Sequence, residues 1–156
     1  MNQELETLYQ TTILDHGHHP RNSGKPKKFD QKLEGFNHLC GDKIMIYCNC
    51  NQHENLKISF ESVSCVICTA SASLMTTELE DASKQQAIAL IDQVLNGLNN
   101  ASLYSKGLSD QLLGLSGVVK FPSRIQCATL PWETTRKIIL ESGSFNNGEN
   151  DARSWR

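Results

Sequence analysis

The chain has 156 residues, the usual length of a single domain, and a domain of this size can bury enough apolar surface to fold without crosslinks. Its 15 basic and 17 acidic side chains give a formal net charge of -2, which offers no support for nucleic-acid binding. No apolar run approaches the roughly 20 residues that span a bilayer, and Glu4 and Glu6 stand where a signal peptide would be basic. We therefore expect a cytoplasmic protein without membrane contact, with one domain over residues 1–140 and a flexible tail over 141–156.

The first predicted elements are a helix and two strands. Apolar residues recur at helical spacing from Leu5 to Leu14, and the prolines and glycine of "HPRNSGKP" end that pattern. Alternating apolar residues predict strands over residues 43–50 and 55–63, and the polar "NQHE" between them has the length of a hairpin connection. The two strands should therefore pair antiparallel. Four side chains of the first strand should share its buried face: Ile44, Ile46, Cys48 and Cys50.

The second half of the chain is predicted to be helical. One helix should follow Cys65, and a second should begin after the N-cap Ser83 and stop at Gly97. A final helix over residues 124–141 is interrupted or started by Pro131. Strands early and helices late predict an α+β fold, a small antiparallel sheet of about three strands with helices packed on it. Three apolar residues of the last helix should help to close the core: Leu130, Ile138 and Leu140.

Six cysteines invite several interpretations. A reducing compartment keeps thiols free, so we expect metal binding or catalysis in preference to disulfides. Cys48 and Cys50 are then small apolar side chains on the buried face of a strand. Cys65 and Cys68 form a CxxC pair, which alone is weak evidence for a zinc site or a redox pair, because a four-thiolate zinc site needs a second such pair.

Three other cysteine positions are more informative. Cys40, Cys65 and Cys127 stand at the ends of predicted elements, where side chains from distant parts of a chain can converge. Glycine between Cys40 and Asp42 lets the backbone turn so that thiolate and carboxylate face a common centre, and one carboxylate with three thiolates would complete a tetrahedron. Arg124 precedes Cys127 by three residues and would share a helix face with it, although a solvated surface arginine is the alternative.

Four motifs, taken in order, resemble the SufU-type branch of the IscU and NifU iron-sulfur cluster assembly proteins: "LYQTTILDHGHHPRN", "CGD", "SVSCVICTASAS" and "FPSRIQCATLPWETT". The resemblance runs from about Leu8 to Ile139 and implies the sandwich fold of the IscU/NifU N-terminal domain. It also implies that Cys68 packs and does not bind metal, and that the histidines of "DHGHHPRN" are not ligands. We assign the histidines to the surface, to capping or to partner contacts. The implied metal site consists of Cys40, Asp42, Cys65 and Cys127.

Two features are typical of the SufU type. Gln126 stands where scaffold members have a histidine, and the stretch from Tyr104 to Pro122 looks like the SufU insertion. The resemblance then implies bound zinc and sulfur transfer from the persulfide of a cysteine desulfurase, SufS, towards other iron-sulfur assembly proteins. Cys40 would be the persulfide acceptor and Arg124 its electrostatic support. Whether such a sulfurtransferase-like acceptor is an enzyme stays open.

Two other functions are compatible with the same residues. One is a non-enzymatic scaffold that assembles a [2Fe-2S] cluster on the four ligands, with iron in place of zinc. The other is a structural zinc protein, in which the metal contributes only stability.

Overall fold

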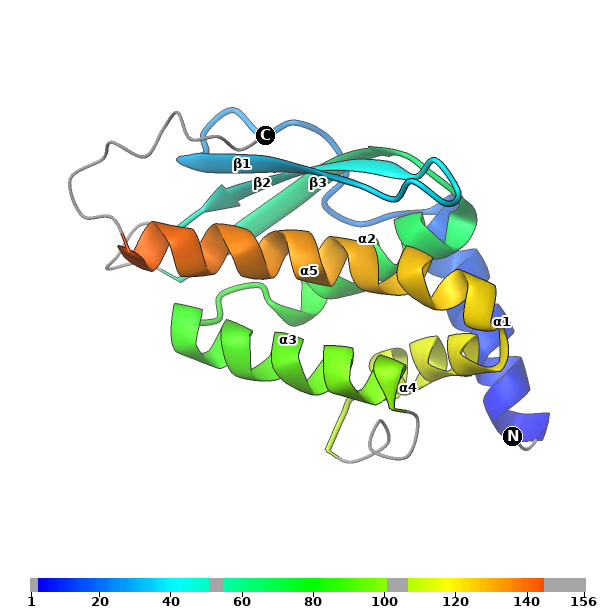
Figure 1. Ribbon diagram of the computed structural model, residues 1–156. Coiled ribbons are helices and arrows are strands. Elements are labelled where there is room, and N and C mark those ends of the chain that lie inside the picture. Colours follow the sequence, from blue (N-terminus) through cyan, green and yellow to red (C-terminus); the bar gives the residue numbers. More distant parts are fainter. Residues whose placement is uncertain (1–2, 51–54, 101–106, 145–156) are drawn as a thin grey trace.

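The computed structural model describes residues 3–50, 55–100 and 107–144, which form a three-stranded antiparallel sheet with helices on one of its faces (Figure 1). α5 packs against β1 and β2, α2 packs against β3 and α5, and α3 lies beyond α5. The fold is therefore α+β, as predicted. In chain order the elements are α1 (Gln3–His18), β1 (Gln31–Phe36), β2 (Lys43–Asn49), β3 (Lys57–Val63), α2 (Val66–Glu78), α3 (Lys84–Asn99), α4 (Asp110–Leu115), the 3-10 helix η2 (Ser116–Lys120) and α5 (Pro122–Ser144).

The sheet is built around β2, with β1 on one side and β3 on the other. Ile46 at the centre of β2 lies opposite Leu33 in β1 and Phe60 in β3, and all three side chains are buried. Burial of alternate residues confirms the two predicted strands, and their register confirms the antiparallel pairing. The predicted hairpin connection, residues 51–54, lies outside the described residues.

β1 is the strand that sequence patterning does not locate. Its burial alternates, but Leu33 is its one large buried side chain, and Gly35 takes the next inward position. A Cβ atom at Gly35 would collide with Oγ1 of Thr134 in α5. Strand and helix approach so closely here that only glycine fits, which fixes α5 across β1.

The helix ends agree only in part with the predictions. Ser83 caps α3 as expected: its hydroxyl accepts from the N–H of Gln86, whose side chain accepts from the N–H of Ser83, both at 3.0 Å. The predicted stop at Gly97 is wrong, because this residue is buried inside α3, which continues to Asn99. The final helix begins at Pro122, where a missing N–H costs nothing, and Pro131 lies inside it.

Two leucines that belong to the predicted apolar patterns are exposed. Leu14, at the end of the helical pattern of the first helix, is 53% exposed, because α1 turns Thr12, Ile13 and His16 inward. Leu140 is 44% exposed, whereas the other two predicted core residues of α5, Leu130 and Ile138, are buried. α5 itself continues past residue 140 to Ser144, and residues 145–156 lie outside the described part of the chain.

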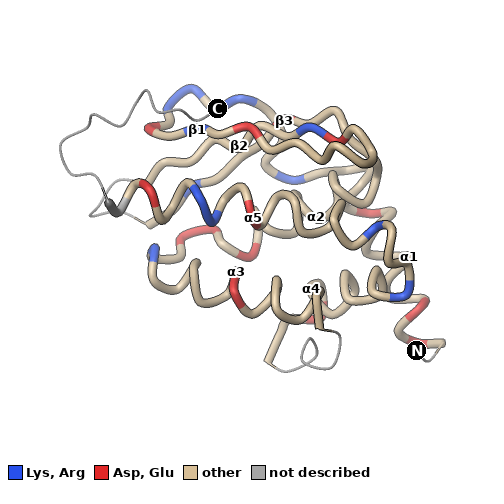
Figure 2. The backbone as a smooth tube through the Cα atoms, viewed as in Figure 1, with Lys and Arg blue, Asp and Glu red and all other residues tan. Residues whose placement is uncertain are grey.

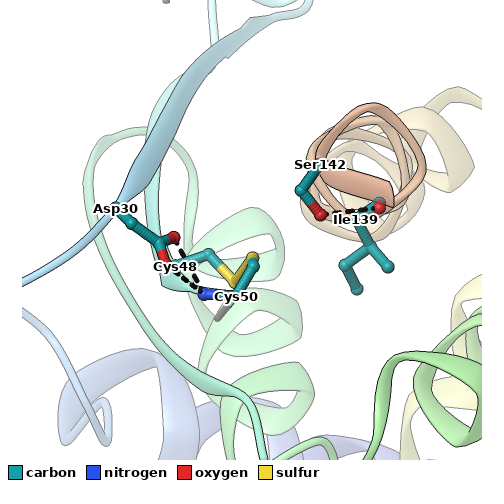
Figure 3. The surroundings of a disulfide bond; sticks show 5 residues. All are labelled: Asp30, Cys48, Cys50, Ile139 and Ser142. Atoms are coloured by element: carbon teal, nitrogen blue, oxygen red, sulfur yellow. Dashed lines mark hydrogen bonds between the residues drawn. A yellow bond between two sulfur atoms is a disulfide. The ribbon is translucent and has the colours of Figure 1, made fainter. Parts of the chain in front are cut away.

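Cys48 and Cys50 are joined by a disulfide, so the prediction of free thiols at these positions is wrong (Figure 3). Both residues are buried, as predicted. The pleat of an extended chain places residues two apart on one face, and the Cα atoms of this pair lie 5.7 Å apart, a separation that a disulfide spans. A reducing compartment favours free thiols in general, but two cysteines this close together can still form a bond. The four remaining cysteines are free.

Charged residues are scattered over the sheet and the helices, with both signs on each layer (Figure 2). The five ion pairs of the described residues all join separate elements or loops at the surface, such as Lys120 of η2 with Glu6 of α1 at 2.6 Å. Within the described residues, no helix combines the length and apolar character needed to cross a bilayer.

Candidate metal centre

Cys40 and Asp42 are brought together by the tight turn between β1 and β2. The N–H of Gly41 donates to the carbonyl of Asn37 at 2.7 Å, and Asn37 in turn donates to the carbonyl of Asp42 at 2.9 Å. Gly41 has a φ of +78°, in the left-handed region that glycine adopts without strain. The turn points both side chains the same way, and the Cys40 thiol donates to Oδ2 of Asp42 at 3.0 Å.

Cys65 stands between β3 and α2 and is the N-cap of that helix. Its sulfur accepts a hydrogen bond from the N–H of Cys68 at 3.5 Å, in the place that a serine or aspartate oxygen usually takes. Its own N–H donates to Oδ1 of Asp42 at 2.8 Å, and its thiol lies 3.5 Å from Oδ2 of the same carboxylate. Asp42 thus ties the β1–β2 turn to the start of α2.

Cys127 comes from the second turn of α5 and is fully buried. Its sulfur lies 3.5 Å from the sulfur of Cys40. The β1–β2 turn and the first turns of α2 and α5 meet at one end of the molecule, on the right in Figure 1. These segments therefore bring Cys40, Asp42 and Cys127 together, with Cys65 beside Asp42.

The spacing of the donor atoms suits a small four-coordinate ion. One ligand atom each of Cys40, Asp42 and Cys127 lies within 4.8 Å of the other two. Cys65 is outside that group, but its sulfur lies 3.5 Å from Asp42 at the edge of the cluster. A tetrahedral zinc ion with these donors needs edges of about 3.5–3.8 Å between ligand atoms. The 3.5 Å between the sulfurs of Cys40 and Cys127 fits such an edge, whereas the Cys65 sulfur would have to approach at least one of these two sulfurs more closely to bind the same ion.

The Asp42 carboxylate is stabilised as an anion. Its burial alone would raise its pKa, but hydrogen bonds from the Cys40 thiol, the Cys65 N–H and the other two thiols outweigh that effect and hold the pKa below its usual range. Burial raises the pKa of the Cys127 thiol, and its contacts with Asp42 and Cys40 raise it further. Without a cation, the cluster therefore keeps its negative charge on the carboxylate and a proton on Cys127.

Arg124 lies one turn before Cys127 on α5 and faces the cluster from the solvent side, as the helical spacing predicts. Its hydrogen bond to Cys127 is the main cause of a raised guanidinium pKa, with smaller effects from Cys65 and Cys40. Cys68, by contrast, is buried among apolar residues, and burial raises the pKa of its thiol to about 12. The CxxC pair is therefore one cluster residue and one core residue.

The surroundings of the cluster include features that sequence patterning misses. Large apolar side chains at this end of the molecule are exposed, Leu39 at 83% and Val63 at 78%. We call four such residues the apolar rim: Leu39 before Cys40, Val63 and Val66 around Cys65, and Phe121 shortly before Arg124. A signal was available in part, because Leu39 and Phe121 lie outside the helices and strands, and Val63 is on the outward side of β3. A cavity of about 1060 Å³ between β1, α3 and α5 contains none of the candidate site residues.

His16 corrects the assignment of the histidines to the surface or to caps. It is buried, its Nε2 donates to Oε1 of Gln111 at 2.8 Å, and its Nδ1 lies 2.7 Å from Oγ of Ser73. The Ser73 hydroxyl already accepts from the N–H of Arg21, so its own proton serves Nδ1. A neutral histidine thus links α1, α2 and α4. His18, His19 and His38 are exposed, and His53 lies outside the described residues.

We expect acid to destabilise the fold through His16. Burial lowers the pKa of His16 in the folded protein below the value of about 6.5 in the unfolded chain. The stabilisation is therefore complete above that unfolded value and is lost as the pH falls from it towards the lower folded pKa. Urea unfolding of wild type and His16→Gln across this window measures the effect. The free energy of unfolding should fall more steeply in the wild type, and parallel curves would contradict this assignment.

The chain is similar to known proteins of one family. The family model described as "NifU-like N terminal domain" matches residues 8–128. The chain is 32% identical over 147 residues to "Zinc-dependent sulfurtransferase SufU" of Bacillus subtilis, covering 93% of this chain and 98% of the relative. It is 31% identical over 144 residues to "Iron-sulfur cluster assembly scaffold protein IscU" of Streptococcus pyogenes, covering 90% and 88%. The solved N-terminal part of a NifU-like protein from Brucella abortus superposes with a TM-score of 0.79 at 17% identity, over 91% of this chain and 99% of that one.

Proposed function

Because the chain belongs to the NifU-like N-terminal domain family of iron-sulfur cluster assembly proteins, as a member of its SufU type, we propose that it is a zinc-dependent sulfur-transfer protein. It accepts sulfur from the persulfide of a cysteine desulfurase of the SufS type and passes it on to other assembly proteins in the cytoplasm. The convergence of Cys40, Asp42 and Cys127, with Cys65 at its edge, carries the proposal.

The donor set favours zinc as the bound ion. Three sulfurs and one carboxylate oxygen match the tetrahedral, sulfur-rich coordination that zinc adopts, and zinc supplies charge that keeps ligand thiols deprotonated without any redox chemistry of its own. Oxygen is the weaker partner in such a set, so Asp42 is the ligand most easily exchanged. A centre with no function beyond stability would more often be all sulfur, or sulfur with histidine.

Cys40 is the sulfur acceptor in this proposal. It is the exposed one among the cluster thiols, since Cys65 is partly buried and Cys127 is buried. Its thiolate attacks the outer sulfur of the desulfurase persulfide, the bond between the two donor sulfurs breaks, and the desulfurase cysteine leaves as a thiolate. The persulfide then resides on Cys40, with the guanidinium of Arg124 offsetting the negative charge nearby.

The apolar rim supports a docking partner at this end of the molecule. Exposed apolar side chains that flank the acceptor are costly in a free protein and are typical of surfaces that become buried in a complex. A desulfurase that covers the rim would also exclude water from the exposed Cys40 sulfur. This protects a persulfide while it passes between proteins.

A scaffold for a [2Fe-2S] cluster is the second candidate, with iron in place of zinc on the same ligands. It is favoured by the relative from Streptococcus pyogenes, which is named a scaffold protein and is 31% identical to the chain, against 32% for the sulfurtransferase of Bacillus subtilis. Gln126, beside Cys127, counts against it, because an exposed amide there offers no imidazole for an iron ligand.

Metal content and desulfurase turnover distinguish the two functions. The purified chain should contain zinc, and its addition to a SufS-type desulfurase should raise the rate at which cysteine is converted to alanine. Absence of stimulation would refute sulfur transfer. Replacement of the zinc by iron, followed by transfer of a cluster to an apo-ferredoxin, would establish the scaffold instead.

A further inference from the structure

The disulfide of Cys48 and Cys50 lies far from the candidate metal centre. β2 begins beside the Cys40 turn, where Lys43 pairs with Phe36, and reaches Cys48 at its other end, where the partner is Gln31. Cys48 lies six positions after Asp42 along an extended strand, a length of about 20 Å. The bonded pair therefore cannot exchange directly with the cluster thiols inside one folded chain.

Asp30 holds the backbone of both cysteines in place. Its N–H donates to the carbonyl of Cys48 at 3.1 Å, and its carboxylate accepts from the N–H of Cys50 at 2.8 and 3.1 Å. Figure 3 shows the two hydrogen bonds from the backbone N–H of Cys50 to this carboxylate, next to the disulfide-bonded pair. Because these bonds do not involve sulfur, they keep the cysteines in register when the disulfide is open. A pair held in this way recloses readily.

The disulfide contributes little as a crosslink. A disulfide stabilises a fold mainly by restricting the unfolded chain, and the restriction grows with the length of the loop that it closes. Here the two cysteines are two positions apart in the sequence, so the disulfide closes a loop with one residue, Asn49, between them. The pair also makes no connection between separate elements, since Cys48 lies in β2 and Cys50 lies one residue beyond the end of that strand. A redox role therefore explains the presence of the disulfide better than a contribution to the stability of the fold does.

We propose that Cys48 and Cys50 form a second thiol site, which is reversibly oxidised and reduced by low-molecular-weight thiols and disulfides, independently of Cys40, Cys65 and Cys127. This inference goes beyond the proposed sulfur transfer and does not depend on it. The pair lies at one end of β2 and the candidate metal centre at the other, so oxidation or reduction of the pair leaves the centre unchanged.

The exposure and position of the two residues give the order of the reaction in this proposal. Cys48 is 0% exposed and lies inside β2, whereas Cys50 is 4% exposed and lies one residue beyond the end of the strand, so attack begins at Cys50. A thiolate such as reduced glutathione attacks the Cys50 sulfur and releases Cys48 as a thiolate. A second glutathione thiolate attacks the glutathione sulfur of the mixed disulfide, which forms oxidised glutathione and frees Cys50. Oxidation is the reverse, with oxidised glutathione as the acceptor of both electrons.

Redox titration of the full chain, as purified and with its metal content measured, tests the site. The protein is equilibrated in glutathione buffers, quenched in acid, alkylated after denaturation and digested with trypsin. Cys48 and Cys50 fall together in the peptide 44–57, whereas Cys40, Cys65 and Cys127 fall in three other peptides. The peptide 44–57 should pass reversibly from dithiol to disulfide as the ratio of the squared concentration of reduced glutathione to the concentration of oxidised glutathione falls. A peptide that stays in one state at every ratio, or joins a cluster cysteine, would overturn the proposal.

Single variants test the order of attack. Cys48→Ala leaves the more accessible sulfur and should accumulate a mixed disulfide with glutathione, whereas Cys50→Ala should remain unmodified over the same time. Equal modification of both would refute Cys50 as the point of entry. Cys68→Ala removes a buried thiol outside the pair and should leave the titration of the peptide 44–57 unchanged.

Discussion

Cys40→Ala should abolish the stimulation of a cysteine desulfurase and leave a folded protein. Sulfur transfer needs a thiol that the donor persulfide can reach, and Cys40 is the exposed thiol of the cluster. Its side chain lies on the turn between β1 and β2, and its one hydrogen bond to a carboxylate is to Asp42, which keeps the N–H of Cys65 as a donor. The metal-free variant should therefore lose no more than about 1 kcal/mol of its free energy of unfolding.

Alanine formation by the desulfurase, with and without the variant, measures the first effect. In the wild type, anaerobic incubation with desulfurase and cysteine should add one sulfur atom to the peptide 33–43, which contains Cys40 as its one cysteine. Cys68→Ala is the matched control, because it removes a buried thiol that lies outside the cluster. Full stimulation by Cys40→Ala would assign the acceptor role to another residue, and sulfur on the peptide that contains Cys127 would identify it.

The candidate site could be predicted because each of its parts is local. Cys40 and Asp42 are held by one glycine turn, and Cys65 stands where a strand pattern changes to a helix pattern. Arg124 and Cys127 share a face through helical spacing alone. The convergence of these segments is a tertiary feature, and it is the resemblance in four motifs that allowed it to be expected.

The parts of the fold that could not be predicted depend on packing partners. β1 carries one large buried side chain, Leu33, and its second inward residue is a glycine selected by contact with Thr134, so no alternation of apolar residues marks it. Leu14 lies next to the inward face of α1 but outside it, because the hydrogen bonds of His16 to α2 and α4 fix the rotation of α1. A stripe of leucines shows that a helix has a buried face, not how that face is turned.

The Cys48–Cys50 bond shows a different limit. The alternation that predicted burial of both side chains also placed their sulfurs on the same face, within bonding distance. Expectation from the compartment then favoured free thiols, although local geometry allowed the bond. Proximity within one strand is a short-range feature, and a CxC on a buried face is sufficient to indicate it.

Asp42→Asn should weaken zinc binding by about 10–100-fold and leave the metal-free fold intact, a loss typical of replaced groups that orient or hold a metal. The asparagine carbonyl can still accept from the N–H of Cys65, but the side chain loses its negative charge and its second acceptor oxygen for the thiols of Cys40 and Cys65. Competition with a chromophoric chelator measures the affinity. Wild-type affinity in this variant would remove Asp42 from the ligand set.

Asp42→Ala separates the two tasks of this carboxylate. It removes the acceptor for the N–H of Cys65 as well as the charge, and an unpaired buried N–H costs about 1–3 kcal/mol. The free energy of unfolding of the metal-free protein should therefore fall for Asp42→Ala and stay close to wild type for Asp42→Asn, while both lose zinc more readily. Because water can replace one weak ligand, both variants should remain folded with zinc bound. Loss of an exchangeable ligand should not unfold the protein. Complete unfolding of both variants would therefore mean that the metal centre is structural.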